Sequence, residues 1–317
     1  LEHMAVFGTE FWNKPINGTV IAIFQTVFNL ITAIILVPFA NQLVKLSTLI
    51  VKDEPEKPHR HPELYTLDEK LYISPSVAVA EATKAVAAMG IIAKNNFARC
   101  CHVLLDGDNS DLDIIESDED SLDKFADRSD RFLIGLSKAV EYAADDRQVD
   151  MLLQTVPSFE RVGDYGTNLV ELAQRLADGN STFSDMAKKE LNLLCEAVNE
   201  ILTITIDAFS KNDNVSAKEI EPLEETIDDM VMMLRDRHTK RLKNGECSID
   251  SGLIFMEALT HLERAADHCS AIAVMMLARN NEEILHNHYE YLRELHTGTD
   301  KHYRSECARR REQYIKP

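Results

Sequence analysis

The chain of 317 residues is 45% hydrophobic and carries a formal net charge of −19. Such a charge repels phosphates, which excludes nucleic acid as a partner for the body of the chain. Only 11 glycines and 9 prolines, few aromatics and many Ala, Leu, Glu, Asp and Lys residues predict an all-helical protein. The six cysteines form no CxxC pair, which is typical of a reduced, intracellular protein without a disulfide framework.

The first predicted element is a membrane-spanning helix from Ile16 to Val37. This stretch carries no charge, and as a helix it is about 33 Å long, which matches the hydrocarbon core of a bilayer. Its Asn, Gln and Thr side chains predict contacts with further membrane helices. The alternative is a buried core helix of a soluble protein. Because the polar side of this span finds no predicted partner helix in the chain, we expect residues 1–52 to be the last part of a membrane region. The start at Leu1 rather than Met agrees with a fragment, and vector-derived residues at Leu1–Met4 are the alternative.

A polar segment separates this span from the rest of the chain. An apolar stripe predicts a helix at the membrane interface from Asn41 to Val51, and residues 53–73 are predicted to be a linker because prolines alternate with charges there. More Lys and Arg residues follow the span than precede it, where Lys14 is the one flanking cation. The positive-inside rule therefore places the residues after about 52 in the cytoplasm, below the cell's inner membrane.

Beyond the linker, apolar residues recur at helical spacing almost without a break, which predicts six long helices in an antiparallel bundle. Gly and Pro residues and N-capping Ser and Asp residues set the predicted ends, and Pro157 is expected to kink the third helix. The predicted helices run from Pro75 to Asp106, from about Leu112 to Ala144, from an N-cap at Asp145–Asp146 to Asp178, from Ser184 to about Phe209, from an N-cap at Ser216 to Asn244, and from about Asp250 to Arg279.

The six predicted helices repeat as two three-helix units, residues 74–179 and 182–280. A shift of 105 residues superposes the apolar stripe of the fifth helix on that of the second, and a shift of 103 residues superposes the sixth helix on the third. The first helix then corresponds to the fourth. We therefore expect one duplicated helical domain over residues 74–280.

Four pairs of acids keep the same register in both repeats. Each pair has Glu and Asp four residues apart, so both carboxylates lie on one helix face, where they repel each other. The pairs are Glu119/Asp123, Glu160/Asp164, Glu224/Asp228 and Glu263/Asp267. Carboxylates from two neighbouring helices are the ligands that Mg, Mn, Ca or iron ions prefer, which predicts one cation site in each repeat. Spacing alone leaves an alternative open, a solvated acidic face with salt bridges to Arg161 and Arg264.

The sequence holds no catalytic constellation. A ferritin-like iron enzyme requires Glu-x-x-His on two bundle helices, and this motif occurs only at Glu283/His286 and, split by a proline, at Glu56/His59. Neither copy repeats. No phosphate-binding Gly-rich loop and no Ser-His-Asp arrangement is present, so we do not expect an enzyme; a carboxylate-bridged metalloenzyme is the remote alternative.

The doubled Glu-Arg-x-x-Asp in a duplicated three-helix unit resembles the PhoU domains of bacterial phosphate regulation. Further segments resemble the sodium/phosphate cotransporter family: residues 25–30 with 38–39 are similar to its last membrane helix, residues 67–71 with 74–75 to the junction before its PhoU-like tail, and residues 289–295 to the end of that tail. Two departures stand out. Gln25 replaces the usual His, and Ala271 stands where the first repeat has Asn168, so we expect the second metal site to bind more weakly.

The resemblance implies a cytoplasmic PhoU-like domain that binds metal and regulates a sodium-dependent phosphate cotransporter. Iron or zinc ions are the implied ligands, with Mg or Mn as alternatives, and sodium and phosphate are the transported ions of the whole protein. Implied partners are upstream membrane helices, the lipid bilayer and a second copy of the chain in a homodimer. A free-standing PhoU-type signalling adaptor is the alternative. Residues 281–317 are predicted to be a charged tail, either disordered or in contact with anionic lipid through Arg309–Arg311.

Overall fold

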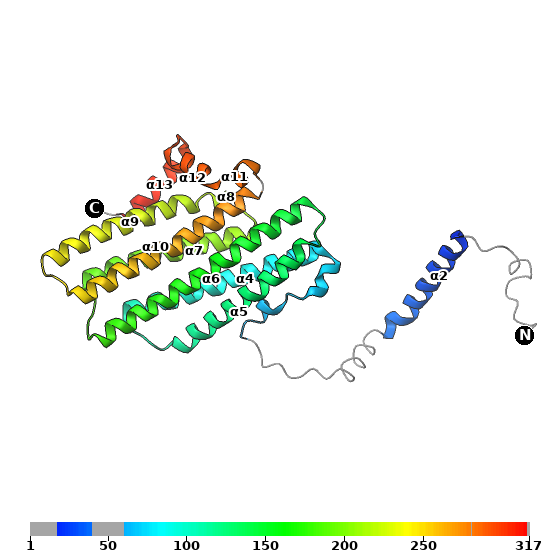
Figure 1. The fold of residues 1–317 in the computed structure, drawn as a ribbon, viewed down its shortest axis with the longest axis horizontal. Coiled ribbons are helices and arrows are strands. Elements are labelled where there is room, and N and C mark those ends of the chain that lie inside the picture. Colours follow the sequence, from blue (N-terminus) through cyan, green and yellow to red (C-terminus); the bar gives the residue numbers. More distant parts are fainter. Residues whose placement is uncertain (1–17, 40–59, 280, 316–317) are drawn as a thin grey trace, which may run out of the picture. The chain divides into compact units, whose positions relative to one another are not determined.

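A computed structural model of the chain describes residues 18–39, 60–279 and 281–315, which separate into two compact units, residues 1–60 and 61–317 (Figure 1). The first 17 residues and residues 40–59 are outside the described part. The predicted interfacial helix from Asn41 to Val51, the flanking Lys14 and most of the predicted linker therefore lie outside the described residues.

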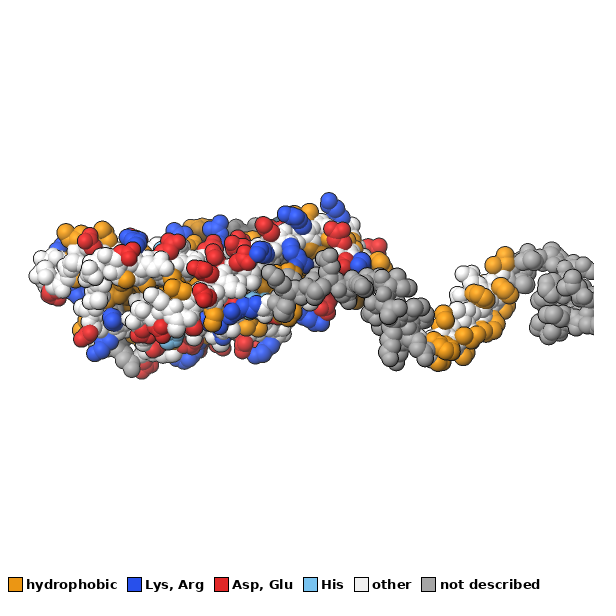
Figure 2. Space-filling model, turned by 90° about the horizontal axis from the view of Figure 1, so that it is seen from below, with side chains coloured by type: hydrophobic (Ala, Val, Ile, Leu, Met, Phe, Trp, Pro, Cys, Tyr) orange, Lys and Arg blue, Asp and Glu red, His pale blue; other side chains and the backbone are white. Residues whose placement is uncertain are grey.

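In the first unit, α2 (Gly18–Leu36) continues into the 3-10 helix η1 (Val37–Phe39). Hydrophobic side chains cover most of the visible surface of α2 (Figure 2), and within this unit none of the residues Ile21–Phe39 is buried. Thr26 and Thr32 donate hydrogen bonds to backbone carbonyls one turn earlier, each at 2.8 Å, so their hydroxyls are satisfied within the helix. Length and hydropathy both suit a membrane span.

The second unit is a bundle of long helices, and the described chain contains no β-strand. The all-α prediction is confirmed, as is the duplicated six-helix bundle. Its helices are α4 (Pro75–Asp106), α5 (Leu112–Ser137), α6 (Ala143–Asp178), α7 (Asp185–Lys211), the short α8 (Asn214–Ala217), α9 (Ile220–Lys243) and α10 (Ile249–Ala278). Helix α4 is also long and apolar enough to cross a membrane, but half of it is buried inside the bundle, as expected of a core helix.

Three predicted helix boundaries are wrong. Helix α5 ends at Ser137, seven residues before Ala144, because no fully buried residue follows Leu136 until α6. Helix α6 has Tyr142 as its N-cap, so Asp145 and Asp146 lie inside its first turn. Ser216 does not cap α9, because the Asp213 carboxylate accepts the backbone N–H groups of Val215 and Ser216 and starts the separate α8. Helix α6 continues through Pro157.

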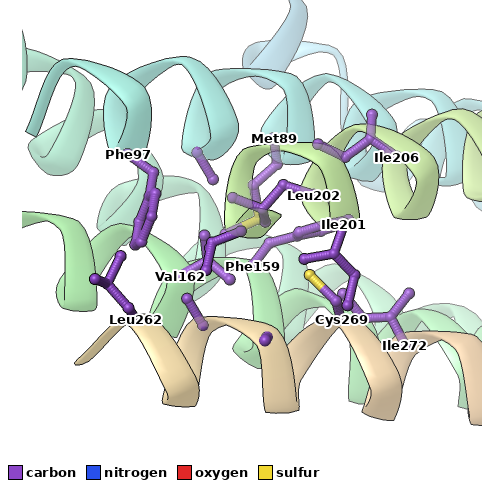
Figure 3. Close-up of a cluster of buried hydrophobic side chains, with 14 of the residues drawn as sticks. Met89, Phe97, Phe159, Val162, Ile201, Leu202, Ile206, Leu262, Cys269 and Ile272 are labelled. Carbon is purple, nitrogen blue, oxygen red and sulfur yellow. The ribbon is translucent and has the colours of Figure 1, made fainter. Parts of the chain in front are cut away.

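The long helices of the two repeats pack around one shared core. Helix α4 packs against α6, α6 against α10, and α10 against α7, while α5 and α9 lie outside these four (Figure 1). Phe159, Val162 and Leu262 meet in this core with side chains from α4 and α7 (Figure 3). The close approach of α4 and α6 requires a small residue at Gly90, where a Cβ atom would lie 2.7 Å from the Phe159 ring. Tight packing of this kind holds the outer helices in register.

Residues 61–73, expected to belong to the linker, pack against α4 and α5. They form η2 (Pro62–Tyr65) and η3 (Glu69–Ile73), and Leu64 is fully buried. The Tyr72 hydroxyl donates a 2.9 Å hydrogen bond to the Phe132 carbonyl. This stretch is therefore part of the bundle.

The prediction of a disordered C-terminal tail is also wrong for the described residues, whereas the alternative of lipid contact stays a prediction. Residues 282–315 form α11 (Glu282–His286), α12 (His288–Thr297) and α13 (Lys301–Tyr314), which we call the C-terminal cap. Helix α13 packs against α9. Its cations meet acids of the bundle: Arg311 pairs with Asp229 at 2.6 Å, and the buried Arg310 pairs with Glu200. Arg310 and Arg311 are thus neutralised by acids of the bundle.

Candidate metal site

The first predicted site is formed where α5 and α6 run side by side. Glu119 and Asp123 on α5 and Asp164 on α6 bring carboxylate oxygens within 4.8 Å of one another. Glu160 lies one turn from Asp164 and outside this triad, although it is close enough to sense the charges of Asp164 and Asp123. The structure therefore unites three of the four acids predicted for the first repeat, which we call the first triad.

The second triad is its counterpart between α9 and α10. Glu224 and Asp228 on α9 and Asp267 on α10 have carboxylate oxygens within the same 4.8 Å limit. Glu263 is outside this triad, because Arg235 donates to its carboxylate at 2.6 Å and holds it toward α9. The two triads occupy corresponding positions in the repeats, as the sequence register predicts.

One position explains why the fourth acid behaves differently in the two repeats. The 105-residue shift that aligns α9 with α5 places Arg235 on Asp130. In the second repeat the arginine pairs with Glu263, whereas in the first repeat the charge of Asp130 adds to the repulsion on Glu160. Glu160 therefore keeps a carboxylate available beside the first triad.

Burial and mutual repulsion disfavour the charged carboxylates in both triads. In the first, burial and the charges of Asp123 and Asp164 raise the pKa of Glu119, and burial followed by Asp123 raises the pKa of Asp164 against the opposing effect of Arg161. A positive ion among these oxygens would remove the repulsion.

The effect is larger in the second triad. Burial, then the charges of Glu221 and Asp228, raise the pKa of Glu224 to about 9. Burial and the charges of Glu263 and Asp267 raise the pKa of Asp228 to about 6. The second triad is thus the more enclosed one, which favours metal binding. This opposes the weaker binding expected because Ala271 replaces the counterpart of Asn168 in the second repeat.

The donor set fits a hard cation. Metal–oxygen bonds of about 2.0–2.6 Å allow two ligands of one ion to lie about 4–5 Å apart, which matches the spacing in both triads. The buried Oδ1 atom of Asp228 has no hydrogen-bond partner in the described chain, although an unpaired buried carboxylate oxygen is costly. Within the described residues, neither triad forms a salt bridge to Arg161 or Arg264, which the solvated-face alternative requires.

Two histidines beside the triads were not predicted. His61 Nε2 lies 2.8 Å from Asp118, the residue before Glu119, and His296 Nε2 on α12 lies 2.7 Å from Glu221, one turn before Glu224. Glu221 also accepts a hydrogen bond from Ser270 on α10. The spacing of Glu221 from Glu224 was visible in the sequence, but both histidines come from segments that were expected to be unstructured.

The helices that carry these triads match a known protein family. The model of the PhoU domain family matches residues 86–173 and 191–276, which together make up more than half of the chain and contain all eight predicted acids. The two matched segments fall on the two three-helix repeats.

Two curated relatives resemble the chain over different lengths. The Thermotoga maritima protein named phosphate-specific transport system accessory protein PhoU homolog 1 is 21% identical over 208 residues, which are 61% of this chain and 89% of that protein. A Salmonella typhimurium protein bears the name "Putative inorganic phosphate export protein YjbB". It is 20% identical over 263 residues, 82% of this chain, and the chain spans about half of its length, 48%.

Two solved structures share the fold. The phosphate transport system regulatory protein PhoU from Streptococcus pneumoniae superposes with a TM-score of 0.60 at 17% identity, covering 67% of this chain and 99% of that one. PhoU from Pseudomonas aeruginosa gives 0.59 at 20% identity, with 66% and 98% covered. About a third of this chain therefore lies outside the shared fold.

Proposed function

The chain belongs to the PhoU domain family, and on that premise we propose that it is the metal-binding regulatory part of a sodium-dependent phosphate cotransporter. Its bundle is a PhoU-like domain of phosphate-transport regulation, and the triads are its ion sites. The observation that carries the metal assignment is the pair of matched triads, each formed by two helices of one repeat.

The transporter context rests on the chain outside the shared fold. The exposed apolar helix α2 has the length and hydropathy of a membrane span, and the longer Salmonella relative is named for phosphate export. The segments similar to sodium/phosphate cotransporters support sodium as the coupling ion. On this proposal α2 contacts upstream membrane helices and lipid, and the positive flank of the span keeps the bundle in the cytoplasm.

A free-standing regulatory adaptor is the second candidate. The Thermotoga relative and both solved PhoU proteins are covered almost entirely by the region they share with the bundle. In such proteins the bundle makes up most of the chain. On this reading α2 would not enter a membrane, and the chain would act through contacts with other proteins.

The residues present define what metal ions would do. Ions held by Glu119, Asp123 and Asp164 would neutralise the first triad and connect α5 to α6, and the second triad would connect α9 to α10 in the same way. Iron, zinc, manganese or magnesium supplies the positive charge that the carboxylates require. Without it, repulsion between neighbouring helices weakens their packing. Occupancy would thereby change the stiffness of the bundle, a role that involves no catalytic step.

Elemental analysis of the full chain in detergent tests the metal assignment. After chelator treatment, the protein is loaded separately with Fe, Zn, Mn or Mg, desalted and measured. We expect uptake of at least one metal, reduced in Asp123→Asn/Asp164→Asn and in Asp228→Asn/Asp267→Asn. The matched control is Asp120→Asn, because Asp120 is exposed on α5 and already pairs with Lys124 at 2.5 Å. No uptake by the wild type, or uptake by both double variants that equals that of the wild type, would contradict the assignment.

A further inference from the structure

A small cavity lies at the end of the bundle where α10 ends and α6 begins. Its volume is about 160 Å³, enough for several water molecules and thus for a small ion. The lining residues are Arg147, Ala278, Arg279, Asn281, Glu282 and Leu285. It is remote along both helices from the carboxylate triads, because Arg147 precedes Asp164 by 17 residues and Arg279 follows Asp267 by 12.

Arg279 is held in place by neutral groups. Its guanidinium donates hydrogen bonds to the amide oxygens of Gln148 on α6 and Asn212 at the end of α7. Gln148 is itself oriented, because its amide N–H donates to the Thr83 hydroxyl on α4 at 3.1 Å. Three helices thus fix the guanidinium without supplying a negative charge, so the positive charge of Arg279 remains available to a ligand.

The other end of the same helix pair shows the contrast. Helices α6 and α10 run antiparallel, and at that end Arg175 on α6 makes two hydrogen bonds to the carboxylate of Glu257 on α10, at 2.5 and 3.1 Å. A bidentate pair of this kind satisfies an arginine fully. Among the residues that the structure describes, no acid pairs with Arg279 in this way.

A second arginine adds to the charge of this cavity. Arg147 is near enough to Arg279 that burial and then the Arg147 charge lower the pKa of the Arg279 guanidinium. In the described part of the chain neither arginine is in a salt bridge, not even with the Glu282 that lines the cavity. Two like charges beside one cavity repel each other, and an anion between them would reverse that cost.

We propose that the cavity between Arg147 and Arg279 binds a phosphate group. Guanidinium groups suit phosphate because their N–H groups match its oxygens in bidentate geometry. The preference for an oxyanion follows from the two arginines, whereas the choice of inorganic phosphate as the ligand rests on the proposed function. Bound phosphate would link the first turns of α6 to the end of α10, the two helices that supply Asp164 and Asp267.

Isothermal titration of inorganic phosphate into chelator-treated full chain in detergent tests this site. Removal of metal prevents phosphate from binding at the triads, so a failed metal assignment does not affect the outcome. We expect one saturable event that weakens with added salt and loses about tenfold or more in affinity in Arg147→Gln and in Arg279→Gln. Arg175→Gln, which removes an arginine at the opposite end, should bind as the wild type does.

Two further measurements complete the test. Thermal unfolding checks that each variant is folded. Because the Arg147 side chain makes no hydrogen bond within the described residues, Arg147→Gln tests the site even if Arg279→Gln does not fold. Phosphatidylglycerol added to the micelles identifies the source of the phosphate group, because displacement of bound phosphate indicates a lipid headgroup and lack of displacement indicates the free ion. No saturable binding to the wild type, or equal affinity in Arg147→Gln, would overturn the proposal.

Discussion

Glu224 has the most strongly raised pKa of the residues in the second triad. Burial and the negative charges of Glu221 and Asp228 raise its pKa from 4.5 to about 9, so in the metal-free protein it holds a proton at neutral pH. A cation that binds there must displace this proton. Metal affinity at the second triad should therefore rise with pH up to about 9.

The same shift predicts the pH dependence of stability without metal. A carboxyl group with a raised folded pKa favours folding while it is protonated, so its contribution is complete below pH of about 4.5 and is lost as the pH rises toward 9. We expect the melting temperature of the metal-free protein to fall across this window. Glu224→Gln, which keeps a neutral side chain at every pH, should flatten the fall.

Thermal unfolding followed by circular dichroism between pH 5 and 9 measures this effect. Glu171→Gln is the control, because Glu171 is exposed on α6 and forms no ion pair in the described chain. Its profile should follow that of the wild type. Parallel profiles for the wild type and Glu224→Gln would show that Glu224 is ionised in the folded protein at neutral pH.

Most of the candidate site could be predicted from the sequence, because a helix converts an i, i+4 spacing into a shared face. The duplicated register then selected the pairs that form the triads. The exclusion of Glu263 could not be predicted from its own helix, since the cause is Arg235 on α9. Aligning the repeats position by position would have revealed it, as Arg235 replaces an acid at Asp130.

At the scale of elements, the six long helices were predictable because each has a continuous apolar stripe that must be buried. The C-terminal cap was not. The buried face of α13 consists of Tyr303, Cys307, Arg310 and Tyr314, which have helical spacing but mixed polarity. Hydrophobic periodicity does not predict such a stripe, because the burial of Arg310 depends on acids that only the folded bundle provides.

Arg310 should therefore be the main anchor of the cap. It is 3% exposed and pairs with Glu200, which also accepts hydrogen bonds from Tyr314 and Gln313. Arg310→Ala should destabilise the protein by about 2–3 kcal/mol, less than the about 3–5 kcal/mol of a fully buried pair because Glu200 stays partly exposed. Chemical denaturation gives the free energy of unfolding, and hydrogen exchange reports whether α13 is released.

The neighbouring arginine provides a matched control. Arg309 is half exposed and pairs with Glu306 within the same helix, so Arg309→Ala should cost at most about 1 kcal/mol. If both variants lose the same stability, or if exchange in α13 is unchanged by Arg310→Ala, the cap is held by its apolar contacts and not by the buried ion pair.

At the scale of the whole molecule, the chain joins the family-matched helices to parts that lie outside the residues matched by the family model. The N-terminal segment with Leu64 and Tyr72 covers α4 and α5, and the C-terminal cap covers α9. Each addition packs on the second helix of its repeat, which is also the helix that supplies two acids to each triad. If ions bind at the triads as proposed, the additions are placed to respond to changes in α5 and α9.

Whether the remaining part, α2, enters a membrane distinguishes a transporter segment from a free-standing adaptor. Its Ile, Leu, Phe and Val side chains are exposed. Such a surface is stable in lipid and costly in water. In cells we expect the chain to stay with the membrane fraction after alkaline extraction. Ile23→Arg/Leu30→Arg should release it, since each arginine near the bilayer centre costs about 2.5–3.5 kcal/mol on insertion.

An arginine pair on the bundle surface serves as the control for this release. Ile134→Arg/Leu253→Arg adds the same charge at exposed positions of α5 and α10, and it should leave the chain in the membrane fraction. If the wild-type chain is instead soluble without detergent, α2 does not enter the bilayer, and the bundle acts as an adaptor. Because the triads and the Arg147–Arg279 cavity are formed by the second unit alone, residues 61–317, metal and phosphate binding would then persist as properties of that adaptor.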